Sequence, residues 1–385
     1  MSAVTIPVDG GVRRITLGEP GDWPKPAAPA QSRVAYAAAH VVADPRGDNG
    51  FGAPAVLDWE STLAFRRHLF SYGLGVAEAM DTAQRNMGLD WAVTQELIRR
   101  SARQALDSGA RICAGAGTDH LPADVRSLGD VAAGYEEQLA VVEGAGARPV
   151  LMASRQLARL ARTPEDYLTV YDRVLRQVRG PVILHWLGEM FDPQLAGYWG
   201  SSDLAKATQT VLGLVREHAD VIDGIKTSLL DIEHEVGLRR ALPPEVRLYT
   251  GDDFHYDELI EGDEHGHSDA LLGAFAAITP AASAALAALD RDDHQAYAAA
   301  LKPTVALSRH VFGAPTQYYK TGIAFLAWLS GHQPGFVMVG GLQSARGLVH
   351  LGEVFRLADE AGLFPDPELA ARRMRGLLEV SGVAQ

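Results

Sequence analysis

Eight short apolar segments, separated by longer stretches of helical periodicity, constrain the fold of this 385-residue chain more than any other feature. Their apolar residues run continuously instead of alternating with polar ones, which is typical of parallel strands that are covered on both faces. A segment with a helical pattern follows most of them. The expected strands are residues 34–42, 74–80, 111–116, 148–152, 181–186, 221–226, 247–250 and 269–275.

This alternation predicts a single (β/α)8 barrel, or TIM barrel, because a closed parallel barrel leaves no strand edge unpaired. An open, doubly wound sheet is the alternative. It is disfavoured because no glycine-rich phosphate loop follows an early strand, and the short run Gly115-Ala116-Gly117 lacks the later glycine of such a loop. We expect the barrel to span residues 33–290.

The two ends of the chain depart from the barrel pattern. Asp9-Gly10-Gly11 lies between two strand-like segments and predicts a β-hairpin, and four prolines follow between residues 20 and 29. We therefore expect residues 1–32 to form an N-terminal appendage and linker. Residues 291–385 have an almost wholly helical pattern, and we expect them to pack on the barrel as a C-terminal extension.

Composition limits the partners of the chain. A formal net charge of -13 argues against nucleic acid and anionic membranes, because both require clustered Lys and Arg. The single cysteine, Cys113, cannot form an internal disulfide. The first residues show no basic region followed by an apolar run, and the alanine-rich segment 273–289 is too short and too interrupted to span a membrane. We expect a cytoplasmic protein with a small-molecule substrate.

Lys226 is the most informative polar residue, because the active sites of such barrels lie at the carboxyl ends of the strands. The period of two in a strand places Gly224 and Lys226 on one face and Ile225 on the other. We expect the lysine to point into the barrel mouth, with room beside Gly224 for a substrate carbonyl. Burial favours the neutral amine, which can attack a carbonyl. The alternative is a lysine that reaches solvent or pairs with Asp223.

His185 ends the expected strand 181–186 and is a second candidate. A histidine beside a reacting carbonyl can move protons near neutral pH, although a structural histidine is equally compatible with this position. The segment 252–267 combines several carboxylates with three histidines, a combination that suits divalent ions. Most acidic loops of this kind are simply solvated, and we expect no metal there.

The segment Ile222-Asp223-Gly224-Ile225-Lys226-Thr227-Ser228 resembles the Schiff-base strand of the dihydrodipicolinate synthase and N-acetylneuraminate lyase superfamily, where a Gly-Ile-Lys-Asp-Ser-like run carries the lysine. Leu57-Asp58, Gly251-Asp252-Asp253 and Gly266-His267-Ser268 are similar to other motifs of the superfamily and occur in the same order. The resemblance covers about residues 33–310. Residues 185–193 resemble a segment found in a divergent, little-characterised branch.

The resemblance implies a class I lyase or aldolase that forms a Schiff base between Lys226 and a keto acid or a sugar-derived keto substrate. It implies a homo-oligomer, a dimer or tetramer, and no metal or organic cofactor. The catalytic residues would be Lys226, His185 and Thr82, with His185 at the position of the superfamily's proton-shuttling tyrosine. The residues that would contact the substrate are Asp81, Gln84, Arg85, Asp119, His120, Thr227, Asp253, His267 and Ser268.

The chain departs from the superfamily pattern at two places. The loop that holds the substrate carboxylate, Gly-Thr-Thr-Gly-Glu in the superfamily, aligns with residues 81–85, where only Thr82 survives and Asp81 replaces the leading glycine. An arginine that commonly follows the tyrosine is missing, and Met190 and Phe191 occupy the region. We therefore expect the fold and the imine chemistry to be retained and favour a hydroxyl-rich, sugar-derived substrate.

Two other functions stay open. A divalent-metal-dependent sugar isomerase or aldolase on the same barrel would use His40, Asp119, His185, Asp253 and His255. A non-catalytic barrel that only binds a ligand is the other possibility. The lysine argues against it, because burying an amine costs free energy and a barrel that has lost its catalytic activity would not need one.

Overall fold

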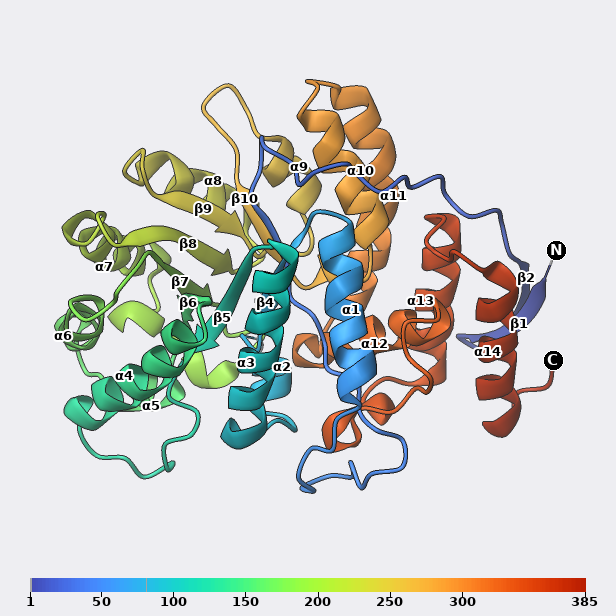
Figure 1. Ribbon diagram of the computed structural model, residues 1–385, viewed down its shortest axis with the longest axis horizontal. Coiled ribbons are helices and arrows are strands. Elements are labelled where there is room, and N and C mark those ends of the chain that lie inside the picture. The colour runs from blue at the N-terminus through green and yellow to red at the C-terminus, as the bar shows by residue number, and fades with distance from the viewer. Residues whose placement is uncertain (1, 81) are drawn as a thin grey trace.

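The computed structural model describes residues 2–80 and 82–385, with the backbone alone at residues 82 and 83. Within this part of the chain, parallel strands form a closed barrel in the order β10-β3-β4-β5-β6-β7-β8-β9 (Figure 1). The (β/α)8 barrel is confirmed, and each strand overlaps its expected segment. The strands are β3 (Ala35–Ala37), β4 (Gly75–Glu78), β5 (Ile112–Ala116), β6 (Arg148–Leu151), β7 (Val182–Leu187), β8 (Ile222–Ser228), β9 (Arg247–Thr250) and β10 (Asp269–Leu272).

The strand β3 is much shorter than the apolar segment 34–42 that contains it. Side chains from elsewhere satisfy the backbone groups that follow it: Lys320 donates to the carbonyl of Ala38, and the hydroxyl of Thr62 accepts from the amide of Val42 at 3.0 Å. The apolar segment therefore extends beyond the strand. Its backbone groups there are buried and are hydrogen-bonded to these side chains instead of to a neighbouring strand.

Helices cover the outside of the barrel, and several begin at the capping residues that their sequences supply. The side chains of Asp58, Asp90, Ser127 and Asp203 each accept from a backbone amide of the first turn. The helices of this layer are α1 (Trp59–Ser71), α2 (Thr82–Arg85), α3 (Trp91–Ser108), α4 (Leu128–Gly144), α5 (Arg155–Leu160), α6 (Pro164–Leu175), α7 (Leu204–Glu217), α8 (Ile232–Ala241), α9 (Tyr256–Glu261) and α10 (Thr279–Leu289). Short 3-10 turns, η1 (Pro193–Leu195), η2 (Tyr198–Gly200) and η3 (Ala274–Ala276), join some of these elements.

The C-terminal part of the chain packs beside the barrel, as Figure 1 shows at the right. It contains α11 (His294–Val311), α12 (Tyr319–Leu329), α13 (Leu348–Glu360) and α14 (Pro367–Val380), with the 3-10 turns η4 (Thr316–Tyr318) and η5 (Val339–Ser344). The expected N-terminal hairpin, β1 (Ala3–Val8) and β2 (Gly11–Thr16), is also present and lies against α13 and α14. None of the described helices is long and apolar enough to cross a membrane.

The barrel interior is a packed core of its own. Two methionines, Met80 and Met152, follow the carboxyl ends of β4 and β6, and the rings of Tyr36 and Tyr249 lie 6.1 Å apart inside the barrel. This inner cluster is separate from the larger apolar cluster between the strands and the helices. Its members are Tyr36, Ala38, Ala77, Met80, Cys113, Val150, Met152, Ile183, Tyr249 and Leu271.

Candidate active site

Lys226 lies near the carboxyl end of β8 and reaches the inner face of the barrel. Its Nζ is 3.8 Å from Sδ of Met80, and the residue is only 6% exposed. Gly251 makes room for the side chain, since a Cβ at residue 251 would come within 2.6 Å of Cε of Lys226. A buried amine therefore occupies the end of the barrel where such folds carry their active sites.

The lysine lines a small, enclosed cavity. The cavity has a volume of about 20 Å³, which suffices for about one water molecule. A keto substrate can therefore reach the amine only if at least one lining side chain moves. The lining residues are Met80, His185, Leu187, Phe191, Lys226, Ser228, Asp253, Gly273, Phe312 and Tyr319.

His185 occupies the position on β7 that pairs with Lys226 on β8. It is 3% exposed, and its Nε2 lies 3.3 Å from Oγ of Ser228. Its Nδ1 has no hydrogen-bond partner among the described residues. Burial, followed by the charge of Lys226, holds the pKa of His185 well below 6.5. The imidazole is thus neutral near pH 7 and can both accept and donate a proton.

A carboxylate and a hydroxyl complete the polar part of the cavity. Oδ1 of Asp253 accepts from the backbone amide of Ala274 at 2.9 Å, which fixes the carboxylate against the turn after β10. Ser228 lies two residues beyond Lys226 and therefore shares its face of the strand. Both side chains can hydrogen-bond to a substrate hydroxyl or carbonyl.

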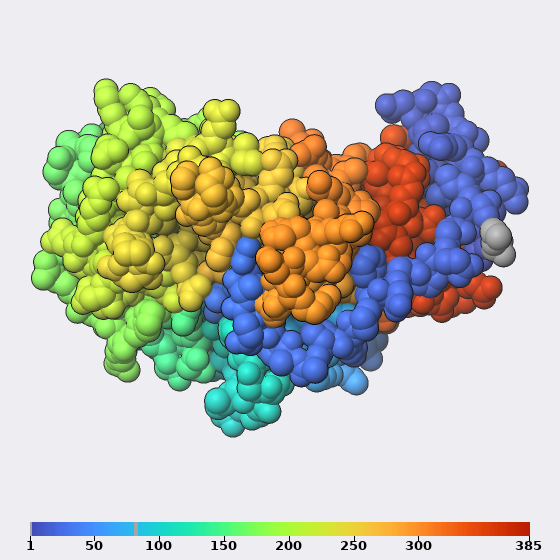
Figure 2. Space-filling model, turned by 90° about the horizontal axis from the view of Figure 1, so that it is seen from above, coloured from blue at the N-terminus to red at the C-terminus, as the bar shows by residue number. Residues whose placement is uncertain are grey.

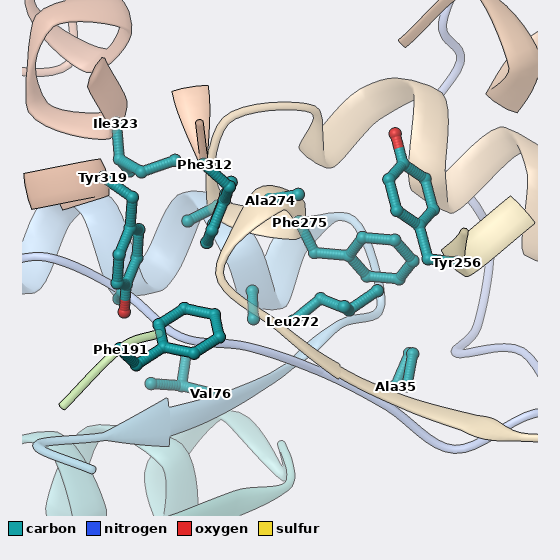
Figure 3. Close-up of a cluster of buried hydrophobic side chains, with 14 of the residues drawn as sticks. Ala35, Val76, Phe191, Tyr256, Leu272, Ala274, Phe275, Phe312, Tyr319 and Ile323 are labelled. Carbon is teal, nitrogen blue, oxygen red and sulfur yellow. The ribbon is translucent and has the colours of Figure 1, made fainter. Parts of the chain in front are cut away.

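Aromatic rings from distant parts of the chain cover this cavity. The rings of Phe312 and Tyr319 are stacked with their centroids 4.4 Å apart, and the ring of Phe191 meets Tyr319 edge-on at 6.2 Å (Figure 3). Phe191 comes from the loop after β7, whereas the other two come from the C-terminal helical region. The apolar cover lowers the polarity around the lysine and separates it from solvent.

A second, larger cavity of about 500 Å³ opens at the carboxyl ends of β5, β6 and β7. Its floor includes Met152 of the inner barrel cluster. Polar side chains line its walls: Oγ1 of Thr118 lies 2.6 Å from Oγ of Ser154 and 2.8 Å from Oε1 of Gln156. Nε of Arg155 donates to Asp192 at 2.6 Å on another wall. The volume and the mixture of polar groups suit a small polar molecule.

Two adjacent residues line different cavities. Phe191 lines the lysine cavity, and Asp192 lines the larger one. Their backbone amides both donate to the carbonyl of Gly188, at 3.1 and 3.4 Å, in a tight turn after β7. The pairing between Arg155 and Asp192 ties this turn to the start of α5. The same turn therefore contributes one residue to each cavity.

Thr227 and Ser268 were expected to contact the substrate, but their hydroxyls bond to Glu235 of α8 instead. Thr227 donates to Oε2 of Glu235 at 3.1 Å and Ser268 donates to Oε1 at 2.9 Å, while Thr250 donates to Oε2 at 3.1 Å. The reason is strand parity, since Thr227 follows Lys226 directly and faces the helices. Burial raises the pKa of Glu235 to about 8.

His267 was also expected at the substrate, and the structure places it elsewhere. It precedes β10 and therefore lies toward the amino end of that strand, opposite to the barrel mouth. Its charged neighbours are Arg33, Asp269, Arg239 and Arg247, none of which lines the lysine cavity. Desolvation and Arg33 lower the pKa of His267.

Arg85 and Asp119 lie together, but each neutralises the other. Nη2 of Arg85 donates to Oδ1 of Asp119 at 2.6 Å and to Oε1 of Gln138 at 2.6 Å. Asp119 lines the larger cavity and is available to a ligand there, whereas Arg85 is buried behind it. His120 turns to α4, with Nδ1 2.7 Å from Nε2 of Gln138 and Nε2 3.1 Å from Glu137.

The remaining expected residues belong to α2 and the segment before it. Gln84 is buried, and its Nε2 has no partner among the described residues. Asp81 lies outside the described residues, and so does the side chain of Thr82. The roles that the sequence suggests for these two residues stay predictions.

The space beside Gly224 does not receive a substrate carbonyl, contrary to expectation. A Cβ at this position would come within 2.7 Å of Cε2 of Tyr249. The tyrosine ring fills the space, and its hydroxyl donates to Oδ2 of Asp223 at 2.6 Å. Gly224 therefore serves close packing inside the barrel. Asp223 also pairs with Arg148 at 2.8 Å.

The residues considered for a metal site have other partners. His40 bonds to Gln333 at 2.7 Å, and His255 bonds to Asp252 at 3.0 Å. Among the described residues, ligand atoms of three suitable side chains come together at Asp172, Glu217 and His218, on the outer helices α6 and α7. Arg176 already pairs with Asp172 there at 2.9 Å.

A protein-family model identifies the family of this chain. A family model described as "Protein of unknown function (DUF993)" matches residues 4–383. The chain belongs to the DUF993 family. No curated protein matches it. The match extends over the hairpin, the barrel and the C-terminal helices.

Solved structures resemble the DUF993 chain in fold. A monomeric dihydrodipicolinate synthase variant aligns with a TM-score of 0.64 at 13% identity, covering 86% of this chain and 97% of its own. Dihydrodipicolinate synthase DapA-2 from Bacillus anthracis aligns with a TM-score of 0.61 at 16% identity, covering 84% of this chain and 98% of its own. YagE from E. coli K12, a prophage protein of the dihydrodipicolinic acid synthase family solved in complex with pyruvate, aligns with a TM-score of 0.60 at 15% identity, covering 91% of this chain and 99% of its own. The DUF993 barrel therefore has the dihydrodipicolinate synthase fold.

Sequence reasoning missed several residues of the site. Ser228 has the parity of Lys226 and could have been found from the strand pattern alone. Thr118 and Ser154 come two and three residues after the ends of β5 and β6, which is the same signal that singled out Asp119. Phe312 and Tyr319 carry no local signal, because they reach the barrel mouth only through the packing of the C-terminal helices.

Proposed function

We propose that this protein is a class I lyase or aldolase that forms a Schiff base between Lys226 and the carbonyl carbon of a keto substrate. The observation that carries the proposal is the placement of a buried lysine and a neutral histidine on paired positions of adjacent strands at the barrel mouth. The fold of the solved dihydrodipicolinate synthases supports it as a scaffold for this chemistry.

The reaction begins when the neutral amine of Lys226 attacks the substrate carbonyl. The carbinolamine loses water and becomes an iminium, which is an electron sink. Cleavage of the neighbouring carbon–carbon bond sends its electron pair into the iminium, while the proton of the β-hydroxyl passes to His185. The aldehyde leaves, the resulting enamine takes a proton at carbon, and water then releases the keto product and regenerates the amine.

The neutral state of His185 suits this role. A base must be unprotonated when it accepts the hydroxyl proton, and the lowered pKa of His185 keeps it so at neutral pH. Ser228, 3.3 Å from Nε2 of His185, can relay a proton between the imidazole and the substrate. Asp253 accepts a hydrogen bond from a substrate hydroxyl in this scheme.

We infer that the substrate is a sugar-derived keto acid whose hydroxylated end occupies the larger cavity. Thr118, Ser154 and Gln156 offer donors and acceptors to hydroxyls there, and Asp119 is an acceptor. Asp192 balances the charge of Arg155 in the wall of the larger cavity. This pair therefore offers no net positive charge to a second carboxylate of the substrate. Phe191 must move so that the carbonyl can reach Lys226.

Turnover assays test the proposal. Sugar-derived keto acids and the pair pyruvate plus aspartate semialdehyde are compared with the wild type, Lys226→Ala and Lys226→Arg. We expect turnover of a sugar-derived keto acid that both variants lose, because arginine keeps the charge but is not a nucleophile. Lys302→Ala, which removes an exposed lysine of α11, is the matched control. Full activity of Lys226→Ala would refute the proposal.

The cytoplasmic location and the dimeric or tetrameric state that the sequence suggests remain proposals. Light scattering after size-exclusion chromatography measures the mass of the particle against the 41.3 kDa of one chain. A particle of one chain would refute the oligomer.

A further inference from the structure

A third cavity lies outside the barrel, where the N-terminal linker meets α1 and α12. Its volume is about 410 Å³, within the range of about 300–1,000 Å³ that is usual for small-molecule sites. It shares no lining residue with the lysine cavity or with the larger cavity at the barrel mouth. We call it the linker cavity. The side chains that matter here are Trp23, Lys25, His68, Tyr72, Ser330 and His332.

The linker forms a fixed wall of this cavity. The backbone amide of Gly21 donates to the carbonyl of Gly362 at 2.9 Å, and Nε1 of Trp23 donates to the same carbonyl at 3.2 Å. Figure 2 shows the N-terminal segment passing along the C-terminal helices on this side of the molecule. The indole is therefore held in place by its own hydrogen bond and presents its ring to the cavity.

Aromatic rings make up much of the opposite wall. The imidazoles of His68 and His332 have their centroids 4.1 Å apart, and His68 lies 5.2 Å from the ring of Tyr72. Neither imidazole makes a hydrogen bond within the described part of the chain. Burial lowers the pKa of His68 to about 3 and that of His332 to about 4. Each neutral ring thus has one donor and one acceptor nitrogen to offer.

The charge of the linker cavity is opposite to that of the whole chain. The protein has a formal net charge of -13, yet no Asp or Glu among the described residues lines this cavity. Lys25 supplies the one permanent charge among the described lining residues, and its Nζ lies 5.5 Å from the centroid of the Tyr72 ring. The hydroxyl of Ser330 adds a neutral donor. An anion is therefore favoured here and a cation disfavoured.

We propose that the linker cavity binds a planar aromatic carboxylate, with the ring against Trp23 and His332 and the carboxylate at Lys25. Flat aromatic faces and apolar walls favour a ring of similar shape. The ammonium and the nearby neutral donors match one carboxylate. Because the cavity contains no residue of the lysine site, this ligand is an additional molecule and not the substrate of the proposed reaction.

Calorimetric titration of the full chain tests the proposal with two probes of the same shape and opposite charge. Naphthalene-2-carboxylate should bind with saturation at one site per chain, and 2-(aminomethyl)naphthalene should bind at least about tenfold more weakly. Lys25→Ala should weaken carboxylate binding about tenfold or more, as expected for the loss of one charge-assisted hydrogen bond. His332→Ala should also weaken it.

Two variants serve as controls for binding at the linker cavity. Lys302→Ala, which removes an exposed lysine that lines none of these cavities, should bind like the wild type. Lys226→Ala should also bind like the wild type, which separates this site from the barrel. Lys25 is exposed on the linker, so its replacement leaves the fold intact. Three results would overturn the proposal: equal affinity for both probes, carboxylate binding that is unchanged in Lys25→Ala, or no binding at millimolar concentrations.

Discussion

His185 of β7 and Lys226 of β8 occupy paired positions on adjacent parallel strands, and both side chains line one cavity at the carboxyl end of the barrel. Strands hold both groups, so their relative position does not depend on the conformation of a loop. The loop after β7 instead carries Phe191, which closes the cavity. In the proposed reaction, the chemistry is fixed in the barrel and access is controlled by the loop.

Replacement of His185 by Asn should lower kcat by about 10²- to 10⁴-fold, because a proton carrier is lost, and should change KM much less. Burial and the charge of Lys226 hold the pKa of His185 well below 6.5, so the wild-type histidine is neutral at neutral pH. Any acid limb of kcat that belongs to His185 should therefore lie below pH 6.5. Profiles of kcat against pH for both proteins measure this.

His294→Asn, at an exposed histidine that begins α11, is the matched control and should leave the kcat profile unchanged. An acid limb at or above pH 6.5 that disappears in His185→Asn would contradict the assigned state of the imidazole.

Asp192→Asn should raise KM by about tenfold while kcat changes less. The change weakens the pairing with Arg155 that ties the turn carrying Phe191 to α5, and it leaves a positive charge in the larger cavity. Steady-state kinetics separates the two parameters, and Asp192→Glu should restore part of the affinity. Asp44→Asn, which breaks the exposed pair with Arg46, is the control. A pure loss of kcat with unchanged KM would show that Asp192 acts in the chemistry and not in substrate access.

Glu235→Gln should make stability less dependent on pH. The pKa of Glu235 is raised from 4.5 to about 8, so the folded state holds this proton between those values whereas the unfolded state releases it. Stability from this group is therefore present at low pH and is lost as the pH rises from 4.5 to 8. Urea unfolding at pH 5.5, 7 and 8.5 should show a smaller decline in the variant than in the wild type.

Glu379→Gln, at an exposed glutamate near the end of α14, should behave like the wild type in the same experiment. A steeper decline in Glu235→Gln would mean that the carboxyl is ionised in the folded protein and is stabilised by the three hydroxyls.

Activity should survive exhaustive treatment with EDTA. The iminium already accepts the electron pair of the broken bond, so a Lewis acid has no separate task in the proposed reaction. Turnover is measured before and after chelation and again after addition of divalent ions. Activity that is lost with EDTA and restored by one ion would favour the metal-dependent isomerase or aldolase.

The barrel could be predicted from the sequence because its signal is local. Each strand is a short continuous apolar run, and most runs are followed by a helical pattern, so the eight strands appear in the right order without knowledge of contacts. The same local parity brings Lys226 and His185 to the inner face. The same parity explains why Thr227 faces the helices. Applied to every residue of the strand, it would have predicted Ser228 instead of Thr227 as a site residue.

The rest of the site depends on contacts between distant residues. Phe312 and Tyr319 lie 86 and 93 residues beyond Lys226 in the chain, and only the docking of the C-terminal helices brings them to the barrel mouth. The space beside Gly224 looked open because the ring of Tyr249 on the next strand cannot be seen in the sequence of β8. Arg85 looked like a ligand for substrate because its partner Asp119 is 34 residues away in the sequence.

Trapping of the Schiff base shows whether Lys226 forms a covalent bond with the substrate. The protein is incubated with a panel of keto acids and sugar-derived keto compounds, treated with borohydride, digested and analysed by mass spectrometry. The account predicts a reduced adduct on Lys226 with the substrate that is turned over, and no adduct on the exposed Lys206 or Lys302. A substrate that is turned over while Lys226 remains unmodified would contradict it.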